Sequence, residues 1–198
     1  MTLVPLDASL HADALWSATG GVRNESLWRY MWDGPFFDRA TFDASLEMKA
    51  ASDDPLFYAI TASGSGKAIG FAALLRIEPK HRVIEVGSLM FGPELRRSRG
   101  ATEAMYLLAR YVFDELGYRR YEWKCDAQNE PSQKAARRLG FTFEGIFRQH
   151  MVVKGRNRDT AWFSILDSEW PSRKLELERW LTPSNFDRDG RQKTSLRR

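Results

Sequence analysis

The sequence predicts one α/β (α+β) domain with a mixed, mostly antiparallel sheet of about seven strands and helices on its faces. Two observations carry this prediction. Segments with strand and helix periodicity alternate in the order βααα-βββ-α-β-α-ββ, and 198 residues suit one sizeable core better than two. Hydrophobic residues make up 43% and charged residues 28%, as is ordinary for a globular domain. We expect the domain to cover residues 1–182.

The first third of the chain predicts one short strand and three helical segments. "TLVPL" has the character of a strand, whereas "SLHADALWSAT", "NESLWRYM" and "DRATFDASLEMKAAS" place apolar residues at helical intervals. The last of these segments opens on an aspartate, a residue type that caps helices. A helical layer is therefore expected between the first strand and the rest of the sheet.

The middle of the chain changes to strand periodicity. "PLFYAITA", "AIGFAALLRIEP" and "RVIEVGSLMFGP" are rich in β-branched and aromatic residues, and the turn-forming stretches "SGSGK" and "EPKH" separate them. Short connections of this kind join antiparallel neighbours. We therefore predict three successive antiparallel strands.

The last part of the chain predicts two helices, a strand, a hairpin and a final helix. The helix after "RRSRG" has one apolar face, "RRYEWKCDA" is a strand, and "EPSQKAARRLG" is a short helix stopped by Gly140. "EGIFRQHMVVKG" and "RDTAWFSILDSEW" form a hairpin around "GRN". In "SRKLELERWL" we expect an amphipathic helix that packs either Leu175 and Leu177 or Trp180 and Leu181.

Charge and cysteine content limit the class of protein. Five Lys/Arg and two Asp in residues 184–198 supply +3 of the net charge of +4, so the body is near neutral and we expect no nucleic-acid partner. We expect residues 183–198 to be a basic, flexible tail. No apolar run is long enough to span a membrane, and no signal peptide is visible. The single cysteine, Cys125, forms no internal disulfide, which favours the cytoplasm.

The stretch "LRRSRG" predicts an anion site. The first turn of the following helix must begin near Arg99 to Thr102, where helix N–H groups lack partners and carry partial positive charge. The arginines add charge to this position, and Gly100 is small enough to let a ligand approach the backbone. The three histidines, His11, His81 and His150, are scattered, so we expect no metal site.

Several motifs in order resemble the GNAT N-acetyltransferase superfamily. They are "EVGSLMF", the basic turn, "ATEAMYLLARYVF", a strand, "N-x-x-S" and "R-L-G-F". The chain is similar, over about residues 1–170, to the RimJ/RimL-type branch that acetylates the N-terminal amines of ribosomal proteins. The resemblance implies an acetyl-CoA cofactor, with a parallel, splayed strand pair at the cofactor site and the pyrophosphate on the loop before the central helix.

The resemblance implies a set of cofactor-binding residues. The phosphate loop consists of Arg96, Arg97, Ser98, Arg99, Gly100, Ala101 and Thr102. Arg99 stands where the family pattern has glycine, which suggests a different loop path or an extra phosphate contact. A backbone N–H around Met90 or Phe91 would polarise the thioester carbonyl, and Asn129 would contact the pantetheine arm.

The resemblance also implies two catalytic residues. Glu85 matches a strand glutamate of the ribosomal branch and would act as base through a water molecule. An exposed strand carboxylate is the alternative for Glu85. Ser132 is the candidate proton donor or thiol-orienting hydroxyl, because Ala136 occupies the position where many GNAT enzymes have a tyrosine. Ser132 and Asn129 are also plausible helix-start residues.

The resemblance implies that the acceptor is a primary amine, either a protein N-terminus or a small molecule. In "LWRYMWDGPFF", Trp28, Tyr30 and Trp32 are candidate substrate-binding residues, although core packing explains most such rings equally well. Two other functions compete with acetyl transfer: a non-catalytic acyl-CoA-binding regulatory module, and a ribosome-associated protein that acts through its basic tail. The sequence leaves a homodimer open.

Overall fold

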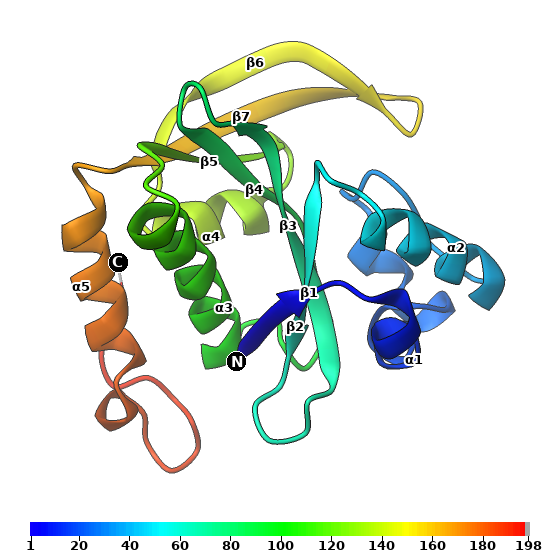
Figure 1. Ribbon diagram of the computed structural model, residues 1–198, viewed down its shortest axis with the longest axis horizontal. Helices are drawn as coiled ribbons and strands as arrows, with labels where there is room; N and C mark the ends of the chain where they lie inside the picture. Colours follow the sequence, from blue (N-terminus) through cyan, green and yellow to red (C-terminus); the bar gives the residue numbers. More distant parts are fainter. Residues whose placement is uncertain (197–198) are drawn as a thin grey trace. The chain divides into compact units, whose positions relative to one another are not determined.

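A computed structural model describes residues 1–196, and its strands form one seven-stranded mixed sheet with a single parallel pair (Figure 1). The sheet order is β1-β2-β3-β4-β5-β7-β6. The strands are β1 (Thr2–Pro5), β2 (Leu56–Thr61), β3 (Ala68–Glu78), β4 (Val83–Phe91), β5 (Arg120–Asp126), β6 (Thr142–Val153) and β7 (Arg156–Leu166). The predicted α/β domain is confirmed.

The helices fall where the apolar spacing predicts them, with one change of type. They are α1 (Ala8–Thr19), α2 (Arg39–Ala50), α3 (Arg99–Arg110), α4 (Glu130–Arg138) and α5 (Trp170–Leu181). The second predicted helix is instead a 3-10 helix, η1 (Val22–Trp28). It begins directly after Gly21, the N-cap residue, whose φ of 75° ends the path of the preceding segment. A π-helical turn, η2 (Tyr111–Glu115), extends α3.

By their internal contacts the residues form two compact units. The first unit comprises residues 1–77 and 86–104, and the second comprises residues 78–85 together with the chain from residue 105 onwards.

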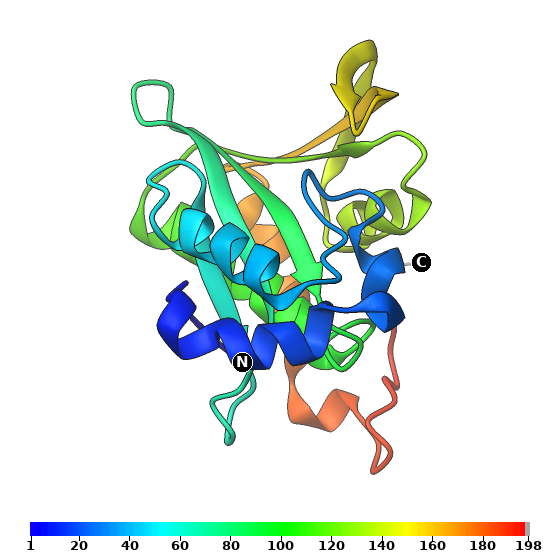
Figure 2. The same cartoon turned by 90° about the vertical axis from the view of Figure 1, so that its right-hand side faces the viewer.

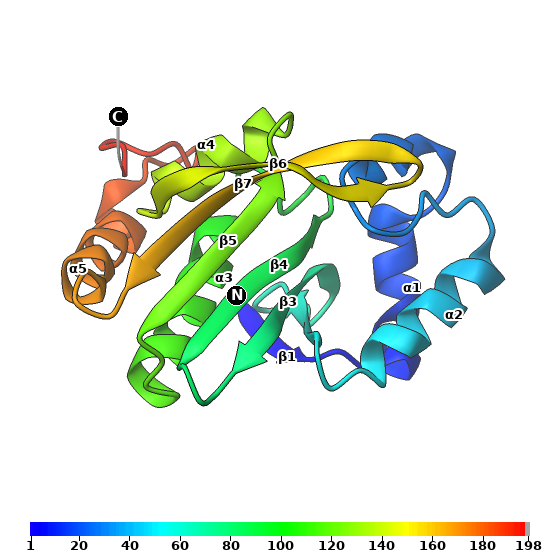
Figure 3. The ribbon, with the colours of Figure 1, turned by 90° about the horizontal axis from the view of Figure 1, so that it is seen from above.

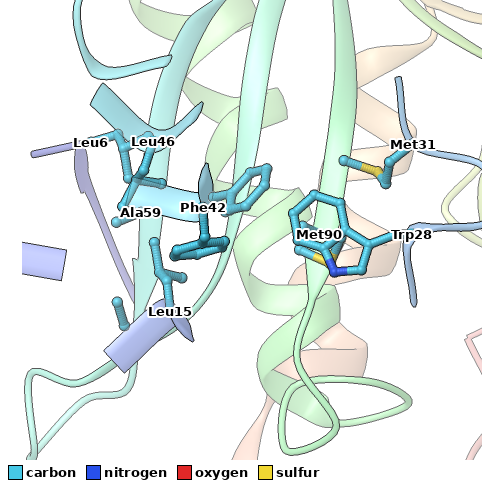
Figure 4. Packing of buried hydrophobic residues seen from close by; sticks show 10 residues of the cluster. Leu6, Leu15, Trp28, Met31, Phe42, Leu46, Ala59 and Met90 are labelled. Carbon is cyan, nitrogen blue, oxygen red and sulfur yellow. The ribbon is translucent and has the colours of Figure 1, made fainter. Parts of the chain in front are cut away.

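In the first unit, α1 and α2 lie side by side and pack on β2 and β3 (Figure 2). Asp7 caps α1 by accepting hydrogen bonds from the amides of Ser9 and Leu10. The core between the helices and the strands is apolar and rich in rings (Figure 4). Its members include Leu6, Leu15, Trp28, Met31, Phe42, Leu46, Ala59, Phe71 and Met90.

In the second unit, β5 and β6 both pair with β7 in antiparallel fashion (Figure 3). One face of β5 is apolar: Tyr121 packs between Phe113 and Phe141, at ring-centroid distances of 5.9 and 5.5 Å. Trp170 of α5 stacks on Phe113 at 5.1 Å, and its indole N–H donates to Asp114 at 2.6 Å. These contacts hold α5 against the end of α3.

The hairpin turn between β6 and β7 begins one residue before the predicted "GRN". Lys154 and Gly155 both have positive φ, 50° and 73°, as the central residues of a two-residue type I′ turn require. The backbone twist of this turn matches that of the paired strands, and Gly155 adopts the left-handed conformation at no steric cost. The turn is therefore centred on Lys154 and Gly155.

Residues after α5 are more structured than we expected. A 3-10 turn, η3 (Pro183–Asn185), is followed by a strand-like bridge between Phe186 and Gln192. Trp180 of α5 anchors this segment, because its indole N–H donates to Gln192 at 2.9 Å and its ring meets Phe186 at 5.0 Å. Of the two predicted packing choices for α5, Leu177 and Trp180 are the buried residues, with one member from each pair. The last two arginines of the tail lie outside the described residues.

Candidate active site

The loop before α3 has the features of an anion site. Its first part is held by Leu95, which is buried, and by Ser98, whose hydroxyl donates to the Leu95 carbonyl at 2.7 Å. The same Ser98 oxygen accepts a hydrogen bond from the amide of Ala101 at 3.1 Å, so it caps the helix. Arg97 has a left-handed φ of 58°, and the Arg96, Arg97 and Arg99 residues are all exposed. The positive end of α3 therefore opens among three guanidinium groups.

Gly100 has a packing reason to be small. A Cβ at this position would lie 2.8 Å from the Met1 sulfur, so the side chain of Met1 occupies the space that a larger residue would need. Thr102 is buried at 4% exposure. The open side of the loop is thus formed by its arginines and its backbone rather than by the Cβ side of Gly100.

The end of β4 is fixed closely to β3. A Cβ at Gly70 would lie 2.5 Å from the Met90 carbonyl oxygen, so only glycine lets the two strands run this close. The Met90 side chain is buried in the core of the first unit. Ser88, two residues earlier, has a left-handed φ of 49° that interrupts the extended path of the strand.

A cavity of about 450 Å³ borders the start of the phosphate loop in the first unit. Its wall includes Gly92, Pro93 and Glu94 at the end of β4, together with Arg23 and Lys67. The cavity therefore brings two cationic side chains next to the residues that lead into the loop.

Glu85 is buried in the second unit, so it is not the exposed strand carboxylate that was the alternative to a catalytic role. It is 4% exposed, and its Oε2 lies 2.9 Å from the ammonium of Lys124 on β5. The same ammonium lies 2.6 Å from Oε2 of Glu122, and the Lys124 side chain is itself only 4% exposed. A buried lysine thus bridges two carboxylates.

This group of charges continues along the sheet. Arg120 donates to Glu122 at 2.6 Å and to Glu144 of β6 at 2.8 Å. The hydrogen bond from Arg120 holds the pKa of Glu144 below its ordinary value. In turn, the hydrogen bonds to Glu144 and, second, to Glu122 raise the pKa of Arg120. Ser164 of β7 donates a further hydrogen bond to Glu144 at 2.7 Å.

Aromatic rings flank the charges on the same face of the sheet. Trp162 of β7 is the cross-strand partner of Lys124, and the Lys124 nitrogen lies 3.9 Å from the centre of its ring. Phe147 of β6 packs on Trp162 at 4.5 Å and is 52% exposed. His150 lies 6.0 Å from the Trp162 ring. Glu85 therefore contacts Lys124, which contacts Trp162, and Trp162 in turn packs on Phe147.

Ser132 and Asn129 lie on the other face of β5. The Asn129 side chain caps α4 by accepting from the Ser132 amide at 3.2 Å, and the Ser132 hydroxyl accepts from the Trp123 indole N–H at 3.0 Å. Trp123 alternates with Lys124, so Ser132 and Glu85 contact opposite faces of the strand. Burial raises the pKa of Cys125, although a hydrogen bond with Ser132 opposes that shift.

The predicted substrate-binding aromatics do not behave alike. Trp28 is a core residue at 1% exposure, because its indole N–H donates to the Thr19 carbonyl at 2.7 Å and its ring packs on Phe36. The structure therefore places it in the core rather than at a pocket rim. Tyr30 is partly buried beside the guanidinium of Arg29, and Trp32 is 47% exposed. Their role in substrate binding stays a prediction.

Sequence reasoning missed Lys124, Glu122 and Trp162. A signal for the first two was present: in "RYEWKCD", charged residues alternate with Tyr121, Trp123 and Cys125. In a strand this alternation places all the charges on one face. Trp162 carries no such signal, because its role depends on strand pairing.

Two classes of site receive no support from the described residues. Among residues 1–196, no three His, Cys, Asp or Glu side chains gather as they would around a metal ion. No helix in this part of the chain has both the length and the apolar character needed to cross a membrane.

A mixed sheet of seven strands and a helix that begins in a basic, capped loop define an α/β protein with features of an anion site at that helix start. The sequence-family model of the acetyltransferase (GNAT) domain matches residues 1–142, which is most of the chain. The chain therefore belongs to the GNAT family of acetyltransferase enzymes.

Solved and curated relatives agree with this assignment. A GCN5-related N-acetyltransferase from Brucella melitensis is 53% identical in sequence, with a TM-score of 0.95 over 98% of this chain and 88% of that one. An uncharacterized N-acetyltransferase of Bacillus subtilis, YoaA, is 36% identical over 50% of this chain and 53% of its own length. The putative ribosomal N-acetyltransferase YdaF of the same organism is 29% identical over 55% and 59%. The chain spans about half the length of these curated relatives.

Proposed function

We propose that this protein transfers an acetyl group from acetyl-CoA to a primary amine, by direct attack of the amine while both ligands are bound. The observation that carries the proposal is the loop before α3, where a capped helix start and three exposed arginines lie together. The GNAT family generally uses acetyl-CoA. The loop fits its pyrophosphate, because guanidinium and helix N–H groups are the donors that phosphates prefer.

The residues proposed to hold the cofactor come from the loop, β4 and α4. Residues 96–102 would bind the pyrophosphate, Met90 and Phe91 would offer backbone groups to the acyl end, and Asn129 and Ser132 would contact the pantetheine arm. Bound acetyl-CoA would supply the acetyl group as a reactive thioester. Because the Asn129 oxygen already caps α4, its amide nitrogen is the atom left to donate to a ligand.

Glu85 is proposed as the proton acceptor. A primary amine is mostly protonated at neutral pH and must lose a proton before it can attack a carbonyl carbon. The buried carboxylate of Glu85 could take that proton directly or through one water molecule. Its low exposure supports this role, since a charged group held out of solvent acts more strongly on a bound ligand.

Ser132 is proposed as the group that orients or protonates the departing thiol. Its hydroxyl oxygen accepts from Trp123 and the same hydroxyl bonds to Cys125, so these two contacts fix its position.

The acceptor is proposed to be a protein N-terminus of the type that the RimJ/RimL branch acetylates. The putative ribosomal N-acetyltransferase among its relatives supports this choice. A small-molecule amine is the second candidate, and the partly exposed rings of Tyr30 and Trp32 would then line its site. We propose that the protein acts in the cytoplasm, where the unpaired thiol of Cys125 stays reduced.

Calorimetry with acetyl-CoA tests the proposal directly. Arg97→Ala removes one charge-assisted contact, so we expect Kd for acetyl-CoA to rise about tenfold, and salt to weaken wild-type binding. Arg188→Ala, which removes an equally exposed arginine after α5, should leave Kd unchanged. Failure of the wild type to bind acetyl-CoA would contradict the proposal.

Thiol release with a panel of amines then tests turnover. The panel should contain short peptides with free N-termini, amino acids and polyamines. Acetylation of peptides alone supports the N-terminal acceptor, and acetylation of small amines alone supports the second candidate. Tight binding without turnover of any amine would instead indicate a non-catalytic acyl-CoA-binding module.

A further inference from the structure

Lys124 stands at the centre of the buried charges on β5. Its ammonium lies 2.9 Å from Glu85 and 2.6 Å from Glu122, and its side chain is 4% exposed. Removing an ammonium group from water costs several kcal/mol, which good geometry with charged partners must offset. A protein that needed only packing at this position could use an apolar side chain.

Three contacts fix the position of the Lys124 ammonium. The two carboxylates hold it from two directions, and the Trp162 ring holds it from a third at 3.9 Å. The indole N–H of Trp162 has no hydrogen-bond partner among the described residues, so packing and the cation contact account for the placement of this ring. Glu122 is in turn held by Arg120 at 2.6 Å. The lysine is thus more tightly held than a lysine in a single ion pair.

We propose that Lys124 is a positioning residue for Glu85. It holds the Glu85 carboxylate in one orientation, so that this group accepts the proton when the acceptor amine loses it. In that step an N–H bond of the amine breaks and an O–H bond forms on Glu85, while Lys124 keeps its own protons. The inference rests on the proposed function, and it adds a residue to which neither the family motifs nor the alternation of charges assigns this role.

The ion pair between Lys174 and Asp114 provides a matched comparison. Its nitrogen and oxygen are 2.6 Å apart, but the two side chains are 35% and 30% exposed, and the pair joins α5 to the end of α3. Such a pair contributes to the packing of helices. It does not contact Glu85, so its loss should affect stability alone.

The test uses the full-length protein with the variants Lys124→Met, Lys124→Arg, Glu85→Gln and the double variant Glu85→Gln/Lys124→Met. Because a misplaced catalytic group slows the chemical step, we expect Lys124→Met to lower kcat at least about tenfold, with KM for the amine within about twofold. Lys124→Arg, which keeps the charge, should recover kcat to within about threefold of wild type. Calorimetry should give an unchanged Kd for acetyl-CoA in all four variants.

The double variant gives the sharpest result. If Lys124 acts through Glu85, the double variant has the same kcat as Glu85→Gln alone, because coupled residues are not additive. A further fall of more than about threefold would show an independent effect of Lys124 and overturn the inference. If Lys124→Met alone fails to fold, the double variant can still be compared with Glu85→Gln. The double variant contains only one of the two carboxylates that lose their lysine partner, because Glu85→Gln removes the other.

Controls separate this inference from the function on which it rests. Lys174→Met should lower Tm and leave kcat unchanged. Wild-type turnover with an unchanged kcat in Lys124→Met would overturn the positioning role alone. Wild-type protein that acetylates no amine would overturn the proposed function, and the role of Lys124 with it.

Discussion

The phosphate loop and the charged face of β5 use positive charge in opposite ways. In the loop, Arg96, Arg97 and Arg99 are exposed and surround the start of a helix. On β5, the Lys124 ammonium is buried between two carboxylates. Exposed charge is easily screened and is available to a ligand, whereas buried and paired charge fixes its neighbours. The first arrangement suits binding, and the second suits the orientation of a reacting group.

The largest expected effect comes from the buried side of this comparison. Glu85→Gln keeps the shape of the side chain but removes its capacity to accept a proton, so kcat should fall about a hundredfold or more. Kd for acetyl-CoA should not change, because the loop is untouched. Steady-state kinetics together with calorimetry measure both quantities. A Glu85→Gln variant with weaker cofactor binding and normal kcat would break the division of roles.

A smaller effect is expected in the loop. Arg99→Gly restores the residue that the family pattern has at this position and removes one cation. If Arg99 contributes an extra phosphate contact, Kd for acetyl-CoA should rise by about threefold to tenfold and depend less steeply on salt. Binding that becomes tighter in the variant would instead mean that Arg99 hinders the path of the loop.

The smallest effect is expected at Glu144, and it concerns stability. The pKa of Glu144 is lowered, mainly by its hydrogen bonds from Arg120, so its ionised form stabilises the folded state at neutral pH. That stabilisation is present above the ordinary value of 4.5 and is lost as the pH falls through the lower folded value. Glu144→Gln should therefore lower Tm slightly at pH 7 and show no difference in strong acid. Equal differences at both pH values would contradict the assigned ion pair.

The fold was largely predictable because its signals are local. Strand periodicity, the aspartate cap of α2 and the apolar face of α3 each lie within a short stretch of chain. The 3-10 helix η1 was missed because apolar spacing over seven residues does not separate it from a short α-helix. The segment after Pro183 was missed because its order depends on Trp180, a residue of the preceding helix.

The site was only partly predictable, because pairing decides much of it. The arginines and the start of the helix that follows them could be predicted, because both signals are local. The burial of Glu85 could not, since it depends on Lys124, which is 39 positions away in the numbering and comes close only through the sheet. Trp28 was a candidate substrate-binding residue, with core packing as the alternative, because a cluster of rings does not reveal which of them turn inward.

The anchoring of the last residues on α5 bears on how the protein can be shortened. Trp180 binds Gln192 and Phe186, and Asn185 donates to the Thr194 carbonyl at 3.2 Å. A version cut at Pro183 would lose these contacts and expose more of the Trp180 ring, while the contact with the guanidinium of Arg138 at 4.6 Å would remain. An exposed ring of this size favours self-association. A soluble short form should therefore retain the chain through Thr194.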